Sequence, residues 1–248
     1  MKQVKPAVSL SKSYEWMCDE AVKNILSLTL KVAAKRGRVN LVLTGGGTVR
    51  GVYARMSTPE YRNDFPWHQI HFFWADERFV PPDHPRSNYR MAVETLLAKV
   101  DVPIENIHPL KTREGDIETC ARIYEEEIRK HFAVSAGKIP SFDLMLLGIG
   151  QDGHVASLFP GSSALEENKR LVVPTFNEEL EEQRLSFTLP LINAAASTFF
   201  VLSGMEKAQI VRDLLNGSDP SLPASRVYAA GNITWFIDKG AASLLSSI

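Results

Sequence analysis

The chain has 248 residues, of which 44% are hydrophobic and 23% charged, and this composition is that of an ordinary globular protein rather than a disordered, collagen-like or disulfide-stapled one. Lysine and arginine number 28 against 29 aspartate and glutamate, which gives a net charge of -1. The chain therefore has no overall electrostatic signature for binding nucleic acid or an anionic membrane.

The two cysteines, Cys18 and Cys120, fall on the apolar stripes of predicted helices, and we expect both to be small core residues. Two cysteines make no disulfide framework in a chain of this length, which fits a reducing compartment. The apolar run at 7–10 is soon followed by Lys12 and Glu15, so the N-terminal sequence lacks the core of a signal peptide. We therefore predict a cytoplasmic protein.

Apolar residues at helical spacing predict two long amphipathic helices. The first begins after Ser13, a good N-cap, and ends at Gly37 behind a cationic last turn at 35–36. The second begins at Asp116 and keeps residues 125–127 near its solvent side. The two stripes are Met17, Ala21, Ile25, Leu28 and Val32, and Ile117, Cys120, Tyr124, Ile128 and Phe132.

Short apolar runs between the helices predict buried strands. They are "NLVLTGG" from residue 40, "QIHFFWADE" from 69, "FDLMLLGIG" from 142, "RLVVPTF" from 170, "STFFVLSG" from 197 and "VYAAGNITWFID" from 227. The uncharged stretch at 185–205 contains Pro190 and Asn193, and it predicts a strand, a turn and a second strand rather than a membrane span.

Strands that alternate with helices over the whole chain predict an α/β protein with an open, mostly parallel twisted sheet and helices on both faces, a Rossmann-like three-layer sandwich. No repeat or long linker interrupts the alternation, so residues 1–248 are predicted to form a single domain. Functional loops in such folds gather at the carboxyl ends of the strands. Four predicted strands end in polar or glycine-rich sequences, "TGGGT", "ADERFVPP", "GIGQDGH" and "SGMEK".

The loop "GIGQDGH" at 148–154 contains the glycine spacing of a dinucleotide-binding turn. However, Asp152 inside it would repel a pyrophosphate, and the next strand ends without the acidic residue that holds a ribose. A dinucleotide site is therefore disfavoured. Two alternatives stay open: a tight structural turn in which His154 is an ordinary polar residue, and a turn that presents Asp152 and His154 for chemistry.

Two other loops have candidate binding groups. "LTGGGT" places residues 45–48 between a strand and a helix, where exposed N–H groups can bind an anion, although a purely structural turn also fits. "WADERFVPPDHPRSNYRM" gathers several charged side chains, and a solvated loop with Ser87 as a helix N-cap explains much of it. His68 and His71 are three residues apart, but no third ligand has metal-site spacing, so we predict no metal site.

Taken together, the loops resemble the 6-phosphogluconolactonase family, which is related to the glucosamine-6-phosphate isomerases (deaminases). The resemblance runs from "LTGGGT" through "WADERFVPPDHPRSNYRM" to "VLSGMEKAQIV", and it is most specific at "FDLMLLGIGQDGHVASLFPG". It implies an open α/β fold, no metal or organic cofactor, and hydrolysis of 6-phosphoglucono-δ-lactone in the oxidative pentose phosphate pathway. We expect this small sugar-phosphate lactone as the partner, no nucleic acid or membrane, and a monomer or small homo-oligomer.

The resemblance also implies roles for individual residues. His154 is expected to be the general base that activates water, and Asp152 to orient either His154 or the sugar hydroxyls. Arg78 is expected near the developing oxyanion. The positions matching the family's phosphate site are Gly45, Gly46, Gly47, Thr48, Arg184 and Lys207, and those matching its sugar pocket are Asp76 and Arg78.

The chain departs from its relatives in two places. The family's phosphate loop usually reads S-G-G-S/T-P, whereas this chain has Gly47 and Val49 at the hydroxyl and proline positions, followed by an unexplained Arg50. The isomerase and deaminase branch resembles "DGHIAFNEPG" where this chain has "DGHVASLFPG", so Phe159 aligns with a catalytic glutamate. That branch is therefore disfavoured, and a non-catalytic sugar-phosphate sensor on the same fold is the other alternative.

Overall fold

The computed structural model describes residues 6–217, 219–228 and 230–245. Its centre is a six-stranded sheet with the order β1-β9-β8-β5-β2-β3, in which all neighbouring strands are parallel. The strands are β1 Ala7–Ser11, β2 Val39–Leu43, β3 Ile70–Trp74, β5 Leu144–Leu147, β8 Ser197–Leu202 and β9 Asn232–Asp238. The predicted α/β fold with a mostly parallel sheet is thus confirmed.

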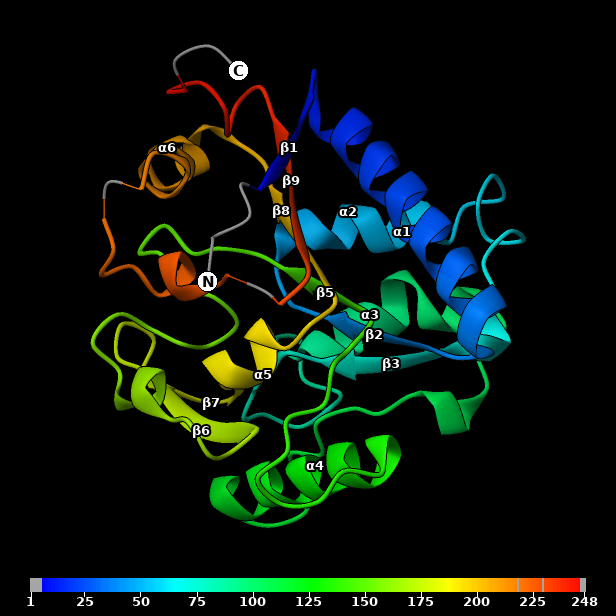
Figure 1. The fold of residues 1–248 in the computed structure, drawn as a ribbon, viewed down its shortest axis with the longest axis vertical. Coiled ribbons are helices and arrows are strands. Elements are labelled where there is room, and N and C mark those ends of the chain that lie inside the picture. The colour runs from blue at the N-terminus through cyan, green and yellow to red at the C-terminus, as the bar shows by residue number, and fades with distance from the viewer. Residues whose placement is uncertain (1–5, 218, 229, 246–248) are drawn as a thin grey trace.

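Helices lie on both sides of this sheet: in Figure 1, α1 and α2 are on one side of β8 and β9, and α6 is on the other. The α-helices are α1 Tyr14–Arg36, α2 Gly47–Met56, α3 Asn88–Thr95, α4 Ile117–Phe132, α5 Leu189–Asn193 and α6 Ala208–Leu215. Short 3-10 helices are η1 Trp67–Gln69, η2 Leu97–Lys99, η3 Ile104–Asn106, η4 Ser163–Glu166, η5 Met205–Lys207 and η6 Pro223–Arg226.

The predicted helix ends are confirmed by their caps. The Ser13 side chain accepts a hydrogen bond from the N–H of Trp16, and Gly37 ends α1 with a φ of 70°. Asp116 caps α4 by accepting from the N–H of Thr119. These caps satisfy N–H groups that have no partner within the helix, which is why such residues mark helix ends in a sequence.

A second, antiparallel sheet with the order β4-β7-β6 was not predicted. It consists of β4 Asp76–Arg78, β6 Val172–Asn177 and β7 Glu182–Phe187. The single predicted strand from residue 69 is divided at Ala75, whose N–H donates to the carbonyl of Leu43 while its own carbonyl accepts from the N–H of Phe187. The chain therefore passes from one sheet to the other at this residue, and the predicted turn after β7 contains the short helix α5.

The interior contains one hydrophobic cluster that extends from Met17 to Ala241 and includes both cysteines. Every residue of β2 and β5 is buried, as expected for parallel strands covered on both faces. We therefore propose that residues 1–248 form one domain. None of the helices in the described part of the chain combines the length and apolar character of a membrane span.

Glu77 of β4 holds the start of α3 from inside the protein. Its Oε1 accepts hydrogen bonds from the N–H groups of Arg78 and Asn88, at 2.8 and 2.7 Å. Its Oε2 accepts from the Ser87 hydroxyl at 3.0 Å and from the N–H of Tyr89 at 2.9 Å. Burial raises the pKa of Glu77 to about 7, although the hydrogen bonds from all four donors lower it.

This raised pKa predicts a pH-dependent stability. The folded protein binds the Glu77 proton more tightly than the unfolded chain does, so the group's contribution to the free energy of unfolding falls as the pH rises from 4.5 to about 7. We expect the unfolding free energy of wild type relative to Glu77→Gln to fall by about 3 kcal/mol over this window. Denaturant titrations at several pH values measure it, with Glu126→Gln on the exposed side of α4 as control. A wild-type-to-variant difference that is independent of pH would contradict the prediction.

Candidate active site

A cavity of about 600 Å³ lies where the loops after β2, β3, β5 and β8 meet, and this volume is typical of small-molecule sites. Every predicted site residue except Asp152 lines it: Gly45, Gly46, Gly47, Thr48, Asp76, Arg78, His154, Arg184 and Lys207. Residues not predicted from the sequence also line it, among them Tyr14, Thr44, Ser203 and Glu206.

The glycine loop after β2 brings the start of α2 to the cavity. A Cβ on Gly45 would lie 2.0 Å from Oδ1 of Asn88, so a side chain there would force the buried Asn88 side chain to move. Gly46 has a φ of 117°, which favours glycine, and α2 begins directly after it. A Cβ on Gly47 would meet nothing within 4 Å. The first N–H groups of α2 and the positive end of its dipole can therefore bind an anion in the cavity.

Two tyrosine hydroxyls hold this loop in place. Tyr53, which is fully buried in α2, accepts a hydrogen bond from the N–H of Thr44 at 3.0 Å and donates one to the Thr44 carbonyl at 2.9 Å. Tyr14 donates to the Thr48 carbonyl at 3.0 Å. Sequence patterns missed both tyrosines because their partners are set by the packing of α1 and α2 against the loop.

His154 and Asp152 form a hydrogen-bonded pair. His154 Nδ1 lies 2.6 Å from Asp152 Oδ1, which also accepts from the His154 N–H at 3.2 Å. Since an ionised carboxylate only accepts, we assign the ring proton to Nδ1 and the free lone pair to Nε2. Burial acts to raise the pKa of Asp152, but the hydrogen bond and the charge interaction with His154 outweigh it, and the pKa is lowered.

Gly150 leaves the space in which this pair forms. A Cβ at this position would lie 2.1 Å from His154 Nδ1 and 2.3 Å from Asp152 Oδ1. Gly153, with a φ of 82°, completes the turn, and a Cβ there would lie 2.7 Å from Leu222. Two of the glycines that resemble a dinucleotide-binding turn, Gly150 and Gly153, are therefore explained by the Asp152–His154 pair and by the turn that holds it.

Three cations line the cavity. Arg184 is buried in β7 and contacts Glu182 Oε2 through Nε and Nη2, at 3.0 and 2.8 Å. Lys207 Nζ donates to the carbonyl of Ile149 at 2.7 Å. Burial is the largest influence on both side chains and lowers the pKa of each. The Nε of Arg78 is buried and has no hydrogen-bond partner in the described ranges. This arrangement favours an anionic ligand.

Asp76 lies buried between the two sheets at the cavity wall. Its Oδ1 accepts from the Thr44 hydroxyl at 3.3 Å and its Oδ2 from the Ser157 hydroxyl at 2.8 Å. Ser157 was not predicted from the sequence, and its N–H donates a hydrogen bond to the Ser186 hydroxyl oxygen at 3.1 Å. The carboxylate is therefore held in one orientation toward the cavity.

Comparison with known proteins identifies the family. The sequence profile described as "Glucosamine-6-phosphate isomerases/6-phosphogluconolactonase" matches residues 12–235. The chain belongs to this family. A 6-phosphogluconolactonase from Synechocystis sp. is 39% identical over 238 residues, covering 95% of this chain and 97% of the relative. The chloroplastic 6-phosphogluconolactonase 3 of Arabidopsis thaliana is 35% identical, covering 98% of this chain and 77% of the relative.

Solved structures of the isomerase/lactonase family share the fold. The 6-phosphogluconolactonase of Thermotoga maritima has a TM-score of 0.82 and 32% identity, covering 95% of this chain and 100% of that one. A monomeric glucosamine-6-phosphate deaminase has a TM-score of 0.81 at 23% identity, covering 96% and 99%. The likeness to the deaminase shows the fold alone, so the side chains of the cavity must separate the two activities.

The departures from the family's usual sequence have distinct places in the structure. The Phe159 ring is buried, and its centroid lies 5.0 Å from the centroid of the His154 ring. The Arg184 guanidinium lies 5.6 Å from the Phe159 centroid. Val49 is buried in the first turn of α2. Arg50 is exposed, and its positive charge helps to lower the pKa of Glu94 in α3, after the larger effect of the hydrogen bond from Arg90. Arg50 is therefore not part of the cavity lining.

Two features lie outside the cavity. A larger hollow of about 1420 Å³ is lined by Asp152, the one predicted site residue that does not line the cavity, and by Phe159. Among the described residues, one cluster could hold a metal, and it consists of His71, His108 and His131. His68, which the sequence analysis considered with His71, contacts Asp101 instead, at 3.3 Å.

The role of Gly150 predicts a sharp difference between neighbouring glycines. Gly150→Ala should break the Asp152–His154 hydrogen bond, because the added methyl group would occupy the space between the two side chains. Gly148→Ala is the matched control, since a Cβ at that position meets nothing within 4 Å. NMR detection of the hydrogen-bonded His154 Nδ1–H proton in both folded variants measures the effect. Retention of that signal in Gly150→Ala would contradict the account.

Proposed function

We propose that this protein hydrolyses 6-phosphoglucono-δ-lactone to 6-phosphogluconate, the second step of the oxidative pentose phosphate pathway. The observation that carries the proposal is the position of His154, which is paired with Asp152 through Nδ1 and lines a cavity that also contains Arg184 and Lys207. This reaction requires a general base and cationic groups that bind the phosphate in the same cavity. The names of the relatives, at 35–39% identity, support the same activity.

In the proposed mechanism His154 acts as general base through Nε2. It removes a proton from a water molecule as the water oxygen attacks the lactone carbonyl carbon. The tetrahedral intermediate then collapses, the bond from this carbon to the ring oxygen breaks, and the imidazolium returns the proton to that oxygen. Asp152 keeps the imidazole in the required tautomer and stabilises its charged form. No metal or organic cofactor takes part in these steps.

Arg78 and Asp76 are the proposed contacts of the sugar portion. The carbonyl oxygen gains negative charge in the transition state, and a fixed cationic donor stabilises it. Arg78 suits this role because its buried Nε has no partner among the described residues. Asp76 retains acceptor capacity for sugar hydroxyls beyond the bonds from Thr44 and Ser157.

The phosphate group is proposed to lie between the start of α2 and the two remaining cations. Gly45, Gly46, Gly47 and Thr48 supply backbone N–H groups or the space that exposes them. Lys207 has donors left after its bond to Ile149, and Arg184 has donors left after its contacts with Glu182. Guanidinium and ammonium groups both suit a phosphate dianion.

The structure gives a physical reason to prefer hydrolysis over the isomerase or deaminase activity. Phe159 lies beside His154, and a phenyl ring cannot transfer the protons that an aldose-ketose isomerisation needs. A non-catalytic sensor has no use for an imidazole whose tautomer is fixed by a carboxylate. Cytoplasmic location, the absence of other partners and a monomer or small homo-oligomer remain predictions.

Loss of the base should remove most of the activity. We expect His154→Ala to lower kcat for lactone hydrolysis by about 10² to 10⁴, the usual contribution of general acid-base catalysis. Asp152→Asn should also lower it, because the amide can donate to Nδ1 and favour the wrong tautomer. His68→Ala, a change at an exposed histidine, is the control. Rates must be corrected for spontaneous hydrolysis, and near-wild-type turnover in a folded His154→Ala protein would rule out this mechanism.

The phosphate site should affect phosphorylated substrate selectively. Lys207→Ala removes a charge-assisted hydrogen bond worth about 1.5 to 3 kcal/mol, so kcat/KM for the phosphorylated lactone should fall roughly 10- to 100-fold. Hydrolysis of unphosphorylated gluconolactone should barely change. Arg184→Ala should act in the same direction, although Glu182 then loses its partner and folding must be checked. Lys31→Ala, on the exposed side of α1, is the control, and equal losses on both substrates would place the phosphate elsewhere.

A further inference from the structure

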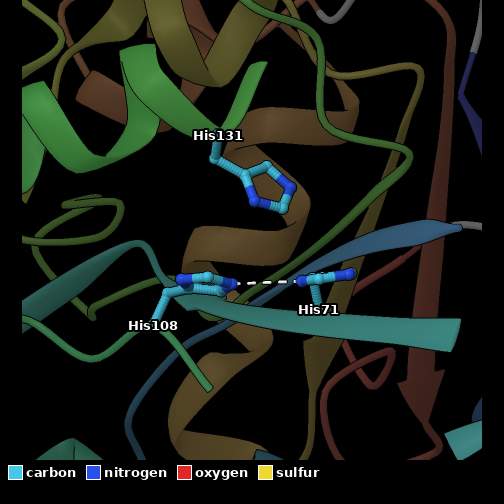
Figure 2. Close-up of side chains that lie close together, drawn as sticks. All are labelled: His71, His108 and His131. Carbon is cyan, nitrogen blue, oxygen red and sulfur yellow. Dashed lines mark hydrogen bonds between the residues drawn. The ribbon is translucent and has the colours of Figure 1, made fainter. Parts of the chain in front are cut away.

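Three histidines from distant parts of the chain lie close together at one edge of the sheet. They are near the amino ends of its strands, whereas the cavity loops follow the carboxyl ends. Figure 2 shows the His131 ring above the His71 and His108 rings. His71 lies in β3, His108 follows η3, and His131 lies in the last turn of α4. His71 is in register with Asn40 of β2, near the amino ends of both strands, whereas the cavity lies at their carboxyl ends. The cluster is therefore separate from the proposed active site.

The spacing of the ring nitrogens is close to that of a metal site. His71 Nδ1 and His108 Nε2 are 3.1 Å apart, and one nitrogen from each of the three rings lies within 4.8 Å of the others. Zinc–nitrogen bonds of about 2.0–2.1 Å in a tetrahedral site place two ligand nitrogens roughly 3.3 Å apart. Two ligands are therefore almost at the required separation, and the third needs a small ring movement.

Hydrogen bonds on the outer side of two rings leave a lone pair on their inner nitrogens. His108 Nδ1 lies 2.8 Å from Glu127 Oε1, so Nδ1 donates to the carboxylate and Nε2 keeps its lone pair. His131 Nε2 lies 2.7 Å from Asn40 Oδ1, so its Nδ1 keeps the lone pair. The Asn40 amide is itself oriented, because its Nδ2 donates to Asp143. Such outer hydrogen bonds typically fix the tautomer and orientation of zinc-binding histidines.

We propose that His71, His108 and His131 bind one zinc ion, with water in the fourth position. Three imidazoles suit zinc among the abundant divalent ions, whereas magnesium and calcium prefer oxygen ligands. Binding replaces the His71–His108 hydrogen bond: the His71 proton moves from Nδ1 to Nε2 through solvent, and both facing nitrogens then coordinate the ion. No net proton release is needed for this exchange.

The surroundings are compatible with a bound cation. Zinc binds neutral imidazoles through a ring lone pair, and the hydrogen bonds to Glu127 and Asn40 leave such a lone pair on His108 and His131. The negative charges of Glu127 and Glu105 favour a cation at the cluster, whereas the positive charge of Arg38 disfavours it.

A zinc ion at this position would join β3, the segment after η3 and α4. The His108 segment already contacts β3 through the bond from its N–H to the Phe72 carbonyl at 2.9 Å, and its carbonyl accepts from the Tyr124 hydroxyl of α4 at 3.1 Å. Helix α4 in turn holds the start of β6, since Glu125 accepts from the N–H of Leu171 at 2.9 Å. Zinc should therefore stabilise the folded protein, with no part in lactone hydrolysis.

The test is a zinc titration of untagged protein from which metals have been removed by chelation. Isothermal titration calorimetry should give one zinc per chain at this site and no comparable binding of magnesium. Cobalt, used as a spectroscopic substitute, should give the intense visible bands of tetrahedral coordination. His71→Gln and His131→Gln should each weaken zinc binding by more than about 100-fold, a larger effect than the roughly 10- to 100-fold that loss of an outer hydrogen-bond partner costs.

One further variant keeps the test decisive if a histidine variant folds poorly, and two others are controls. Glu127→Gln retains all three ligands, and it should weaken zinc binding roughly 10- to 100-fold with an unchanged circular dichroism spectrum. His68→Gln and His154→Gln should leave the affinity unchanged, because neither residue belongs to the cluster. Absence of zinc binding, undiminished binding in His71→Gln and His131→Gln, or loss of the site in His154→Gln would overturn the proposal.

Discussion

The hydrogen bond between Asp152 and His154 is the interaction on which the proposed chemistry depends. Two side chains only two residues apart can meet at 2.6 Å because the turn closes on itself, with the Gly150 N–H donating to the His154 carbonyl at 2.9 Å. That turn follows β5, whose residues are all buried. The imidazole is thus oriented before substrate arrives, and this kind of preorganisation reduces the reorganisation needed in the transition state.

The second constraint is electrostatic, and it is local. The chain as a whole is nearly neutral, yet the cavity gathers Arg78, Arg184 and Lys207 from three different segments. Buried cations need compensation: Glu182 pairs with Arg184, and Lys207 donates to the carbonyl of Ile149 while the negative charges of Glu206 and Asp152 act on it. The donors of these cations that are not yet used are well suited to a phosphate dianion, and no sum over the composition could reveal them.

The helix ends and the mostly parallel sheet could be predicted from the sequence, whereas individual long-range contacts could not. Caps such as Ser13 and Gly37 act within one turn of a helix, so their residue types are informative alone. The division of the chain at Ala75 depends on Leu43 and Phe187, which lie far away in sequence. The sequence did locate Asp152 and His154 in one turn, but the hydrogen bond between them could not be derived from spacing.

The same distinction explains the histidine cluster. His71 and His108 are 37 residues apart, and short-range metal-binding motifs do not contain such a spacing. The histidine near His71 along the chain is His68, which contacts Asp101 instead, so the spacing alone predicted no metal site. Only the packing of α4 beside β3 brings His131 to the other two rings.

The most direct test of the central claim compares two activities of the wild-type protein. Hydrolysis of 6-phosphoglucono-δ-lactone is followed with correction for the spontaneous reaction, and ammonia release from glucosamine-6-phosphate is measured in parallel against heat-inactivated protein. The account predicts rapid lactone hydrolysis and no ammonia above the control. Ammonia release, or lactone hydrolysis no faster than the spontaneous rate, would contradict it.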